Sequence, residues 1–233
     1  MEILKLLEKD GFKILRISDW HTFDYREAKC GSAEVKKCVY ERGLYLMEGV
    51  DGYDFFYVKK RINVTTLCVN GETVMVDDPL HYHGMRLLAS ASEGHVLTAG
   101  LGLGLYTIFL QQNPKVKTIT VVEISEDVKN LILPMISKYI TKPTKVVIDD
   151  IFNYLDKAKD YDTIMLDIWV SDQPNPAIFG EMMYAYKTFS NANPNAKVYI
   201  WGSRDPKINP ASRGVSLKYV MFVNSVVRGG LYE

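Results

Sequence analysis

The sequence has 233 residues, with 28 basic and 28 acidic side chains, 47% hydrophobic residues and 24% charged residues. This composition is that of a folded globular protein and differs from that of disordered or small disulfide-rich chains. The zero net charge provides no overall attraction to nucleic acids or acidic membranes, so we expect a small-molecule substrate rather than a nucleic acid.

The cysteines and the apolar segments restrict the setting further. Cys30, Cys38 and Cys68 are widely spaced and form no Cys-x-x-Cys pair, which indicates reduced thiols and no zinc cluster. No window approaches the length of a membrane-spanning segment, and the charged N-terminus is unlike a secretory signal. We therefore expect a cytoplasmic protein with no metal site and no membrane partner.

Short strands are predicted in the first third of the chain, at 12–17, 37–40, 44–47, 54–60, 64–69 and 72–76. Asn70-Gly71, between the last two, is a strong hairpin signal because both residues tolerate a positive φ. Asp78 and Pro79 then predict the start of a helix that extends to about Ser90. Residues 1–78 are thus expected to form a β-rich appendage.

From Gly94 onward, predicted strands alternate with predicted helices. The strands are 95–99, 117–124, 145–148, 162–167 and 197–201, and the helices are 104–112, 126–139, 150–155 and 177–189. This order predicts an α/β domain over residues 79–233, with a mostly parallel sheet and helices on both faces. Residues 217–227 fit either a helix or a final strand.

A glycine-rich turn, Thr98-Ala-Gly-Leu-Gly-Leu-Gly104, joins the first of these strands to the first helix. Glycines let a ligand approach the backbone, and the helix N-terminus offers N–H groups to negative ligand atoms. Tight packing alone could also explain the turn. The third glycine comes one residue earlier than in the dinucleotide fingerprint, and no P-loop Gly-Lys-Ser/Thr follows, so neither of these sites is expected.

Acidic residues end three successive strands of the predicted sheet. Glu123 follows the glycine turn by about 20 residues, where a carboxylate can bind both ribose hydroxyls, although it could also be a helix cap or a solvated acid. Of the pair Asp149 and Asp150, one could bind an adenine amino group and the other cap the next helix. Asp167 ends the fourth strand. Because parallel strands end at one edge of a sheet, the sequence predicts a single acidic crevice there.

The segment from Val64 to Trp169 resembles the Rossmann-like, class I SAM-dependent methyltransferases, in particular their spermidine-synthase-like branch. The similar motifs are Cys68-Val-Asn-Gly-Glu-Thr73, Asp77-Asp-Pro-Leu-His-Tyr-His83, the glycine turn, Val-Glu123-Ile, Asp150-x-Phe and Leu-Asp167. The resemblance covers nearly half of the chain. It implies a Rossmann-like methyltransferase fold and SAM-dependent methyl transfer to an unidentified acceptor.

By this resemblance, the glycines would hold the methionine part of SAM, Glu123 the ribose and Asp150 the adenine, and Asp167 would face the sulfonium. The expected cofactor contacts are Gly100, Leu101, Gly102, Gly104, Glu123, Ile124, Asp149, Asp150, Ile151, Asp167 and Trp169. Aminopropyltransferases carry an acid where this chain has Leu103, and a second acid where it has Ile168-Trp169. Aminopropyl transfer is therefore the less expected activity, and a SAM-binding module without catalysis is a further alternative.

A base is needed when the acceptor loses a proton, and Asp167, Tyr82 and His83 are the candidates near the crevice. Tyr82 could instead pack as an aromatic core residue, and His81 and His83 could merely pack or be solvated. Trp169 could stack on the acceptor or the sulfonium, or belong to the core.

Two expectations concern the end of the chain. Arg204, after the fifth strand, could bind an anionic substrate group, although a solvated surface position is the simpler interpretation. The predicted sheet is also shorter than the seven strands of a methyltransferase sheet. A second subunit could complete its edge, which would make the protein a homo-oligomer.

Overall fold

The computed structural model describes residues 2–9, 14–16, 20–49, 52–170, 176–203, 205 and 207–212. A parallel sheet with the strand order β10–β9–β8–β11–β12 forms the centre of the molecule. Its strands are β8 (Gly94–Ala99), β9 (Val116–Glu123), β10 (Thr144–Ile148), β11 (Thr163–Leu166) and β12 (Lys197–Ile200). This is the order of Rossmann-like sheets, so the predicted α/β class is confirmed.

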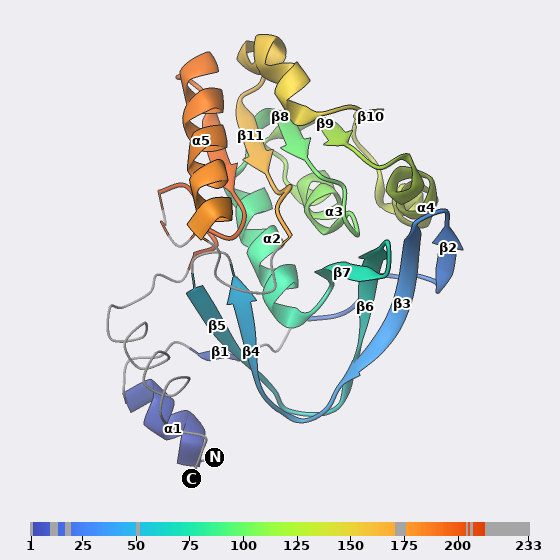
Figure 1. Ribbon diagram of the computed structural model, residues 1–233, viewed down its shortest axis with the longest axis vertical. Coiled ribbons are helices and arrows are strands. Elements are labelled where there is room, and N and C mark those ends of the chain that lie inside the picture. Colours follow the sequence, from blue (N-terminus) through green and yellow to red (C-terminus); the bar gives the residue numbers. More distant parts are fainter. Residues whose placement is uncertain are drawn as a thin grey trace.

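Helices cover both faces of this sheet (Figure 1). They are α2 (Pro79–Ala91), α3 (Leu105–Gln112), α4 (Glu126–Ile136), η1 (Ser137–Tyr139), η2 (Ile151–Asp160) and α5 (Pro176–Ala192). Successive strand residues point to opposite faces: Val96 packs in the core of α2, α3 and α4, and Leu97 in the core of η2 and α5. The near-continuous apolar strands of the sequence therefore reflect burial on both faces.

The N-terminal part forms two further sheets, with the orders β2–β3–β6–β7 and β1–β5–β4. Its elements are α1 (Glu2–Lys9), β1 (Ile14–Arg16), β2 (Ala28–Cys30), β3 (Ala33–Tyr40), β4 (Gly43–Gly49), β5 (Gly52–Val58), β6 (Ile62–Val69) and β7 (Glu72–Val76). The predicted hairpin is confirmed, because Asn70 and Gly71 have φ values of 53° and 86°. The short elements α1 and β2 were not predicted from the sequence.

The β2–β3–β6–β7 sheet and the parallel sheet share one hydrophobic core, in which Phe23 and Tyr25 pack with residues of α2, α3 and α4. The Tyr25 hydroxyl donates to the carbonyl of Leu103 at 2.7 Å. Both the N–H and the hydroxyl of Ser32 donate to Asp127 Oδ2 at 2.8 Å. The division at residue 78 coincides with the junction between β7 and α2, and its status as a domain boundary stays a prediction.

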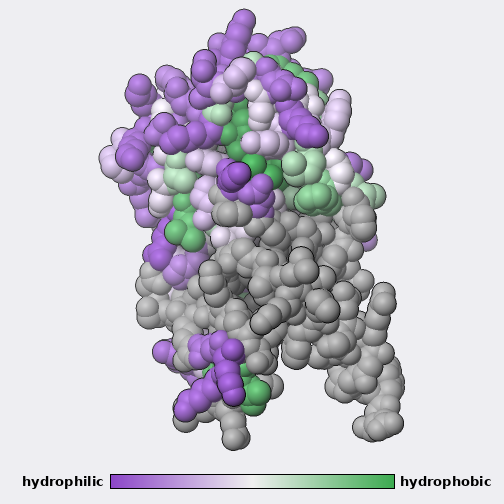
Figure 2. Space-filling model, turned by 90° about the vertical axis from the view of Figure 1, so that its left-hand side faces the viewer, coloured by the Kyte–Doolittle hydropathy of each residue, from purple (hydrophilic) through white to green (hydrophobic). Residues whose placement is uncertain are grey.

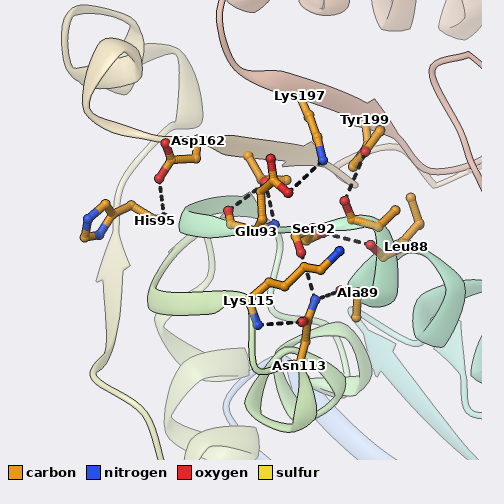
Figure 3. A network of polar contacts seen from close by, with 12 residues as sticks. Leu88, Ala89, Ser92, Glu93, His95, Asn113, Lys115, Asp162, Lys197 and Tyr199 are labelled. Atoms are coloured by element: carbon orange, nitrogen blue, oxygen red, sulfur yellow. Dashed lines mark hydrogen bonds and ion pairs between the residues drawn. The ribbon is translucent and has the colours of Figure 1, made fainter.

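A polar network closes the amino-terminal edge of the parallel sheet (Figure 3). The Asn113 side-chain amide donates to the carbonyls of Ala89 and Ser92 at 2.7 and 2.8 Å. Asp162 Oδ2 accepts the His95 N–H at 2.7 Å. Backbone groups that the strands and helices leave unpaired at this edge are thereby satisfied.

Some predicted elements differ in detail or lie outside the described residues. The helix predicted at 126–139 ends as an α-helix at Ile136 and continues as η1, and the one predicted at 150–155 is a 3-10 helix that reaches Asp160. Arg204 and residues 217–227 lie outside the described residues.

On the face that carries α5, apolar side chains gather below a largely hydrophilic upper part (Figure 2). Among the described helices, none is long and apolar enough to cross a membrane.

Gly94 gives a test of the packing at the amino-terminal edge. Its φ is +66°, and a Cβ there would overlap the carboxylate of Asp162. We expect Gly94→Ala to lower the free energy of unfolding by about 2–4 kcal/mol in urea denaturation, because it adds both strain and a clash. Gly180→Ala is the control: no atom lies within 4 Å of its Cβ position, and it should raise stability by roughly 0.5–1 kcal/mol. Equal effects of the two substitutions would contradict this account.

Candidate functional site

A cavity of about 720 Å³ lies at the carboxyl edge of the parallel sheet. The strand order reverses between β8 and β11, and open α/β sheets bind ligands at such a switch point. The loops after β8, β9, β10, β11 and β12 contribute to the lining, and the β6–β7 hairpin forms one wall. The predicted residues that line the cavity are Gly100, Gly102, Glu123, Ile124, Asp149, Asp150, Ile151, Asp167 and Trp169.

The three glycines of the turn have φ values of +85°, +51° and +78° at positions 100, 102 and 104. A Cβ on Gly100 would overlap the backbone carbonyl of Asp167, and one on Gly102 would overlap the sulfur of Met75. Gly104 packs against Ile136 and does not line the cavity. The protein's own packing therefore requires these glycines, and only the first two also face the space for a ligand.

Four N–H groups of the turn already have partners within the protein. The Gly100 and Gly104 N–H groups donate to the carbonyls of Val122 and Leu101 at 2.8 Å. The Leu101 N–H donates to Glu123 Oε2 at 2.7 Å, and the Leu103 N–H donates to the Met75 sulfur at 3.1 Å. The expectation that the turn offers unpaired N–H groups is corrected for these four positions. Leu101 itself is 5% exposed and packs in the core, so its side chain is not part of the cavity lining.

Glu123 connects the glycine turn to the start of α4. Its side chain is buried, its Oε2 accepts the Leu101 N–H, and its Oε1 accepts the Ser125 N–H at 2.9 Å. The cap of α4 is instead Ser125, whose hydroxyl accepts the Val128 N–H. Because each carboxylate oxygen accepts more than one hydrogen bond, Glu123 can still bind two hydroxyl groups of a ligand in the cavity.

The two neighbouring acids after β10 have different local roles. Asp150 Oδ1 accepts the Phe152 N–H at 2.9 Å and caps η2, which identifies Asp150 as the helix cap of the pair. Asp149 Oδ1 accepts hydrogen bonds from Asn153 and from the Asp150 N–H, and these bonds lower its pKa. Within the described part of the chain, no group of three or more His, Cys, Asp or Glu side chains could hold a metal ion.

Asp167 is the half-buried acid at the centre of the cavity, after β11. Burial raises the pKa of its carboxyl to about 7; the charge of His81 opposes this shift and the charge of Glu123 adds to it. Such a carboxyl changes its charge near neutral pH. It can therefore either stabilise a positive charge in the cavity or exchange a proton there.

Tyr82 and His83, predicted beside the crevice, are not among the residues that line the cavity. The Tyr82 side chain is 4% exposed, its hydroxyl lies 3.1 Å from His21 Nδ1, and its ring stacks on Phe23. His83 Nδ1 lies 3.0 Å from a guanidinium nitrogen of Arg86. The physical reason is the helix period: each step along α2 turns the side chain by about 100°, so residues after His81 face elsewhere.

Among the described histidines, His81 lines the cavity, together with Trp201 after β12, and neither was predicted as a site residue from the sequence. Their ring centroids lie 5.4 Å apart. The cap at Asp78 fixes the phase of α2, so a helical wheel built from this cap could have singled out His81. The β7 residues Thr73 and Met75 were also missed, because their place in the cavity wall depends on long-range packing.

Comparisons with known proteins add three distant structures. No family model matches the sequence, and no curated protein matches it at a significant level. The spermidine synthase from Thermotoga maritima is 16% identical, with a TM-score of 0.41, over 67% of this chain and 62% of that chain. A spermidine synthase in complex with the transition-state analogue AdoDATO is 15% identical, with a TM-score of 0.42, over 68% and 62%. SMU.776, described as a methyltransferase complexed with SAH, is 18% identical, with a TM-score of 0.35, over 46% and 30%. The chain thus spans less than two thirds of each of these proteins.

The raised pKa of Asp167 predicts a pH-dependent stability. Below about pH 4 the carboxyl is protonated in both the folded and the unfolded state. Between pH 4 and 7 only the folded state keeps the proton. The stability that the protonated carboxyl contributes is therefore fully present below about pH 4, decreases as the pH rises, and is lost above about pH 7. Asp167→Asn should therefore gain more stability over the unmodified protein at pH 8 than at pH 5. We expect a difference of about 2 kcal/mol in urea denaturation, after allowance for solvent screening.

Asp149→Asn is the matched control for this measurement. Hydrogen bonds lower the pKa of Asp149, so this carboxyl is ionised in the folded and the unfolded state at both pH values. Its substitution should change stability equally at pH 5 and pH 8. A pH-independent effect of Asp167→Asn would show that the Asp167 pKa is not raised.

Proposed function

We propose that this chain is a SAM-dependent transferase that methylates a small-molecule acceptor. The observation that carries the proposal is Glu123, which the Leu101 and Ser125 N–H groups hold in a cavity at the switch point of the sheet. A carboxylate fixed at this point beside a glycine turn suits the two hydroxyls of a ribose. The cavity volume of about 720 Å³ is in the range of small-molecule and cofactor sites.

The charges of the cavity favour SAM over a pyrophosphate-containing cofactor. Among the described residues that line it, four are acids and none is a lysine or arginine. A pyrophosphate would meet uncompensated negative charge there, whereas a sulfonium would be stabilised. Apolar and aromatic side chains, including Ile124, Ile151 and Phe152, provide a surface on which an adenine can pack.

The residues of this chain would bind and orient the reacting groups. SAM supplies the electrophilic methyl group. Glu123 would hold the ribose, Asp167 would stabilise positive charge when it is ionised, and the β6–β7 hairpin would limit the access of water. Alignment of the acceptor with the transferred carbon is the main contribution that such a site can make to the rate.

Aminopropyl transfer from decarboxylated SAM is the second candidate, and one observation favours it. The Leu103 N–H, which follows the cavity-lining Gly102, is bonded to the sulfur of Met75 and is therefore covered from the carboxylate of a bound SAM. The described lining also offers no cationic side chain for that carboxylate. A cofactor that lacks the carboxylate would avoid both difficulties.

Glu123→Gln tests the central assignment by isothermal titration calorimetry. We expect the unmodified protein to bind SAH, and the substitution to weaken this binding at least tenfold, because a neutral amide accepts ribose hydrogen bonds less well than a carboxylate. Glu126→Gln, at an exposed position at the start of α4, should leave the affinity unchanged. The absence of heat with millimolar SAM or SAH would overturn the proposal.

A competition between SAM and decarboxylated SAM separates the two candidate activities. For methyl transfer we expect SAM to bind at least as tightly as its decarboxylated form. The reason is that the methionine carboxylate, a stronger acceptor, would then replace the Met75 sulfur as the partner of the Leu103 N–H. A tenfold preference for decarboxylated SAM in calorimetry would instead select aminopropyl transfer. Tight SAM binding without turnover in any cell extract would indicate a non-catalytic module.

A further inference from the structure

One corner of the cavity is built by three residues from three different elements. His81 comes from the first turn of α2, Asp167 follows β11, and Trp201 follows β12. The proposed function would place the cofactor against Glu123 and the glycine turn and would leave this corner to the acceptor, so the inference about it rests on the proposed function.

The indole of Trp201 forms a rigid wall of the corner. A Cβ on Gly84 would overlap the indole ring, so the ring packs directly against the backbone of α2. The backbone N–H of Trp201 donates to the carbonyl of Leu166 at 3.0 Å, so the backbone of Trp201 is fixed as well. A fixed flat apolar ring is a suitable surface for stacking another flat ring.

His81 is held in one orientation by the cap of its own helix. Its Nδ1 lies 3.2 Å from Asp78 Oδ1, and the Asp78 side chain is fully buried. The same oxygen accepts the N–H groups of Leu80 and His81 at 2.9 and 3.0 Å, so the carboxylate cannot move without uncapping α2. With Nδ1 directed to Asp78, Nε2 is the nitrogen left for a molecule in the cavity. An imidazole oriented by a carboxylate in this way is a good proton acceptor.

The charges around His81 decide which acceptor fits. Asp77, Asp78 and Asp167 act on it; burial lowers the pKa of His81, but the charge and hydrogen bond of Asp78 and the charges of the other two outweigh burial and raise it. An anionic acceptor would find no lysine or arginine among the described lining residues. A cationic acceptor would share the carboxylates of the cavity with the sulfonium and be repelled by it, and it would also meet the imidazolium once His81 is protonated. A neutral acceptor avoids both costs.

We infer that this corner binds the acceptor, which is a neutral planar ring that carries a hydroxyl or N–H group. The ring stacks on Trp201, and its O–H or N–H donates to His81 Nε2. A lone pair of the acceptor oxygen or nitrogen forms the new bond to the transferred carbon, while the carbon–sulfur bond breaks and its electrons remain on sulfur as a neutral thioether. The proton of the acceptor passes to His81 Nε2, and the positive charge ends on an imidazolium near Asp78 and Asp167.

Histidine NMR tests this assignment, because the chain has only four histidines. The Cε1–H signals of 13C-histidine-labelled protein are assigned with single His→Gln variants and recorded with saturating SAH. We expect millimolar phenol to shift the His81 signal and to bind at least fivefold tighter than benzoate or benzylamine. His81→Gln should weaken phenol binding at least fivefold and change SAH affinity less than twofold.

His95→Gln is the matched control, since His95 lies at the opposite edge of the sheet, with its Nδ1 2.8 Å from the Thr118 hydroxyl. It should change neither phenol nor SAH binding. Trp201→Leu should weaken phenol binding and keep SAH binding. Tighter binding of benzoate or benzylamine, or phenol binding that is insensitive to His81→Gln, would overturn the inference while SAH binding upholds the proposed function. A protein that fails to bind SAH would overturn both.

Discussion

The bridge that Glu123 makes between two loops is the constraint on which the cavity depends. Its two carboxylate oxygens accept the N–H of Leu101 in the glycine turn and the N–H of Ser125 at the start of α4. Hydrogen bonds from backbone amides to a buried carboxylate are strong, so they hold the ends of β8 and β9 in a fixed geometry. The same carboxylate faces the cavity, so the group that organises the site is also available to a ligand.

Residues of the N-terminal part, Met75 and Tyr25, complete this arrangement. Met75 of β7 packs against Gly102 and accepts the Leu103 N–H, while Tyr25 donates to the Leu103 carbonyl. The backbone N–H and the backbone carbonyl of Leu103 are thus both held by residues from the N-terminal part. One wall of the cavity therefore belongs to a segment that lies far from the glycine turn in sequence, and substitutions in β7 will alter the ligand site directly.

The zero net charge of the chain conceals an acidic edge whose members differ in their environments. Burial raises the pKa of Asp167 to about 7, whereas hydrogen bonds lower the pKa of Asp149 in the same cavity. These two carboxyls, at the ends of β10 and β11, therefore have different charges near neutral pH. Asp167 is the one whose charge can respond to a cationic ligand or to a change of pH near neutrality.

The sequence by itself determined the features that depend on local signals: the alternating strands and helices, the Asn70-Gly71 hairpin, the Asp78 cap, and the acids that end successive strands. These follow from backbone preferences and from the rule that parallel strands end at one edge. Only the tertiary structure decided that His81, rather than Tyr82 or His83, faces the cavity, and that Met75 occupies an N–H of the glycine turn. The physical reason is that one residue turns a helical side chain by about 100°, and that contacts between distant segments leave no periodic trace in the sequence.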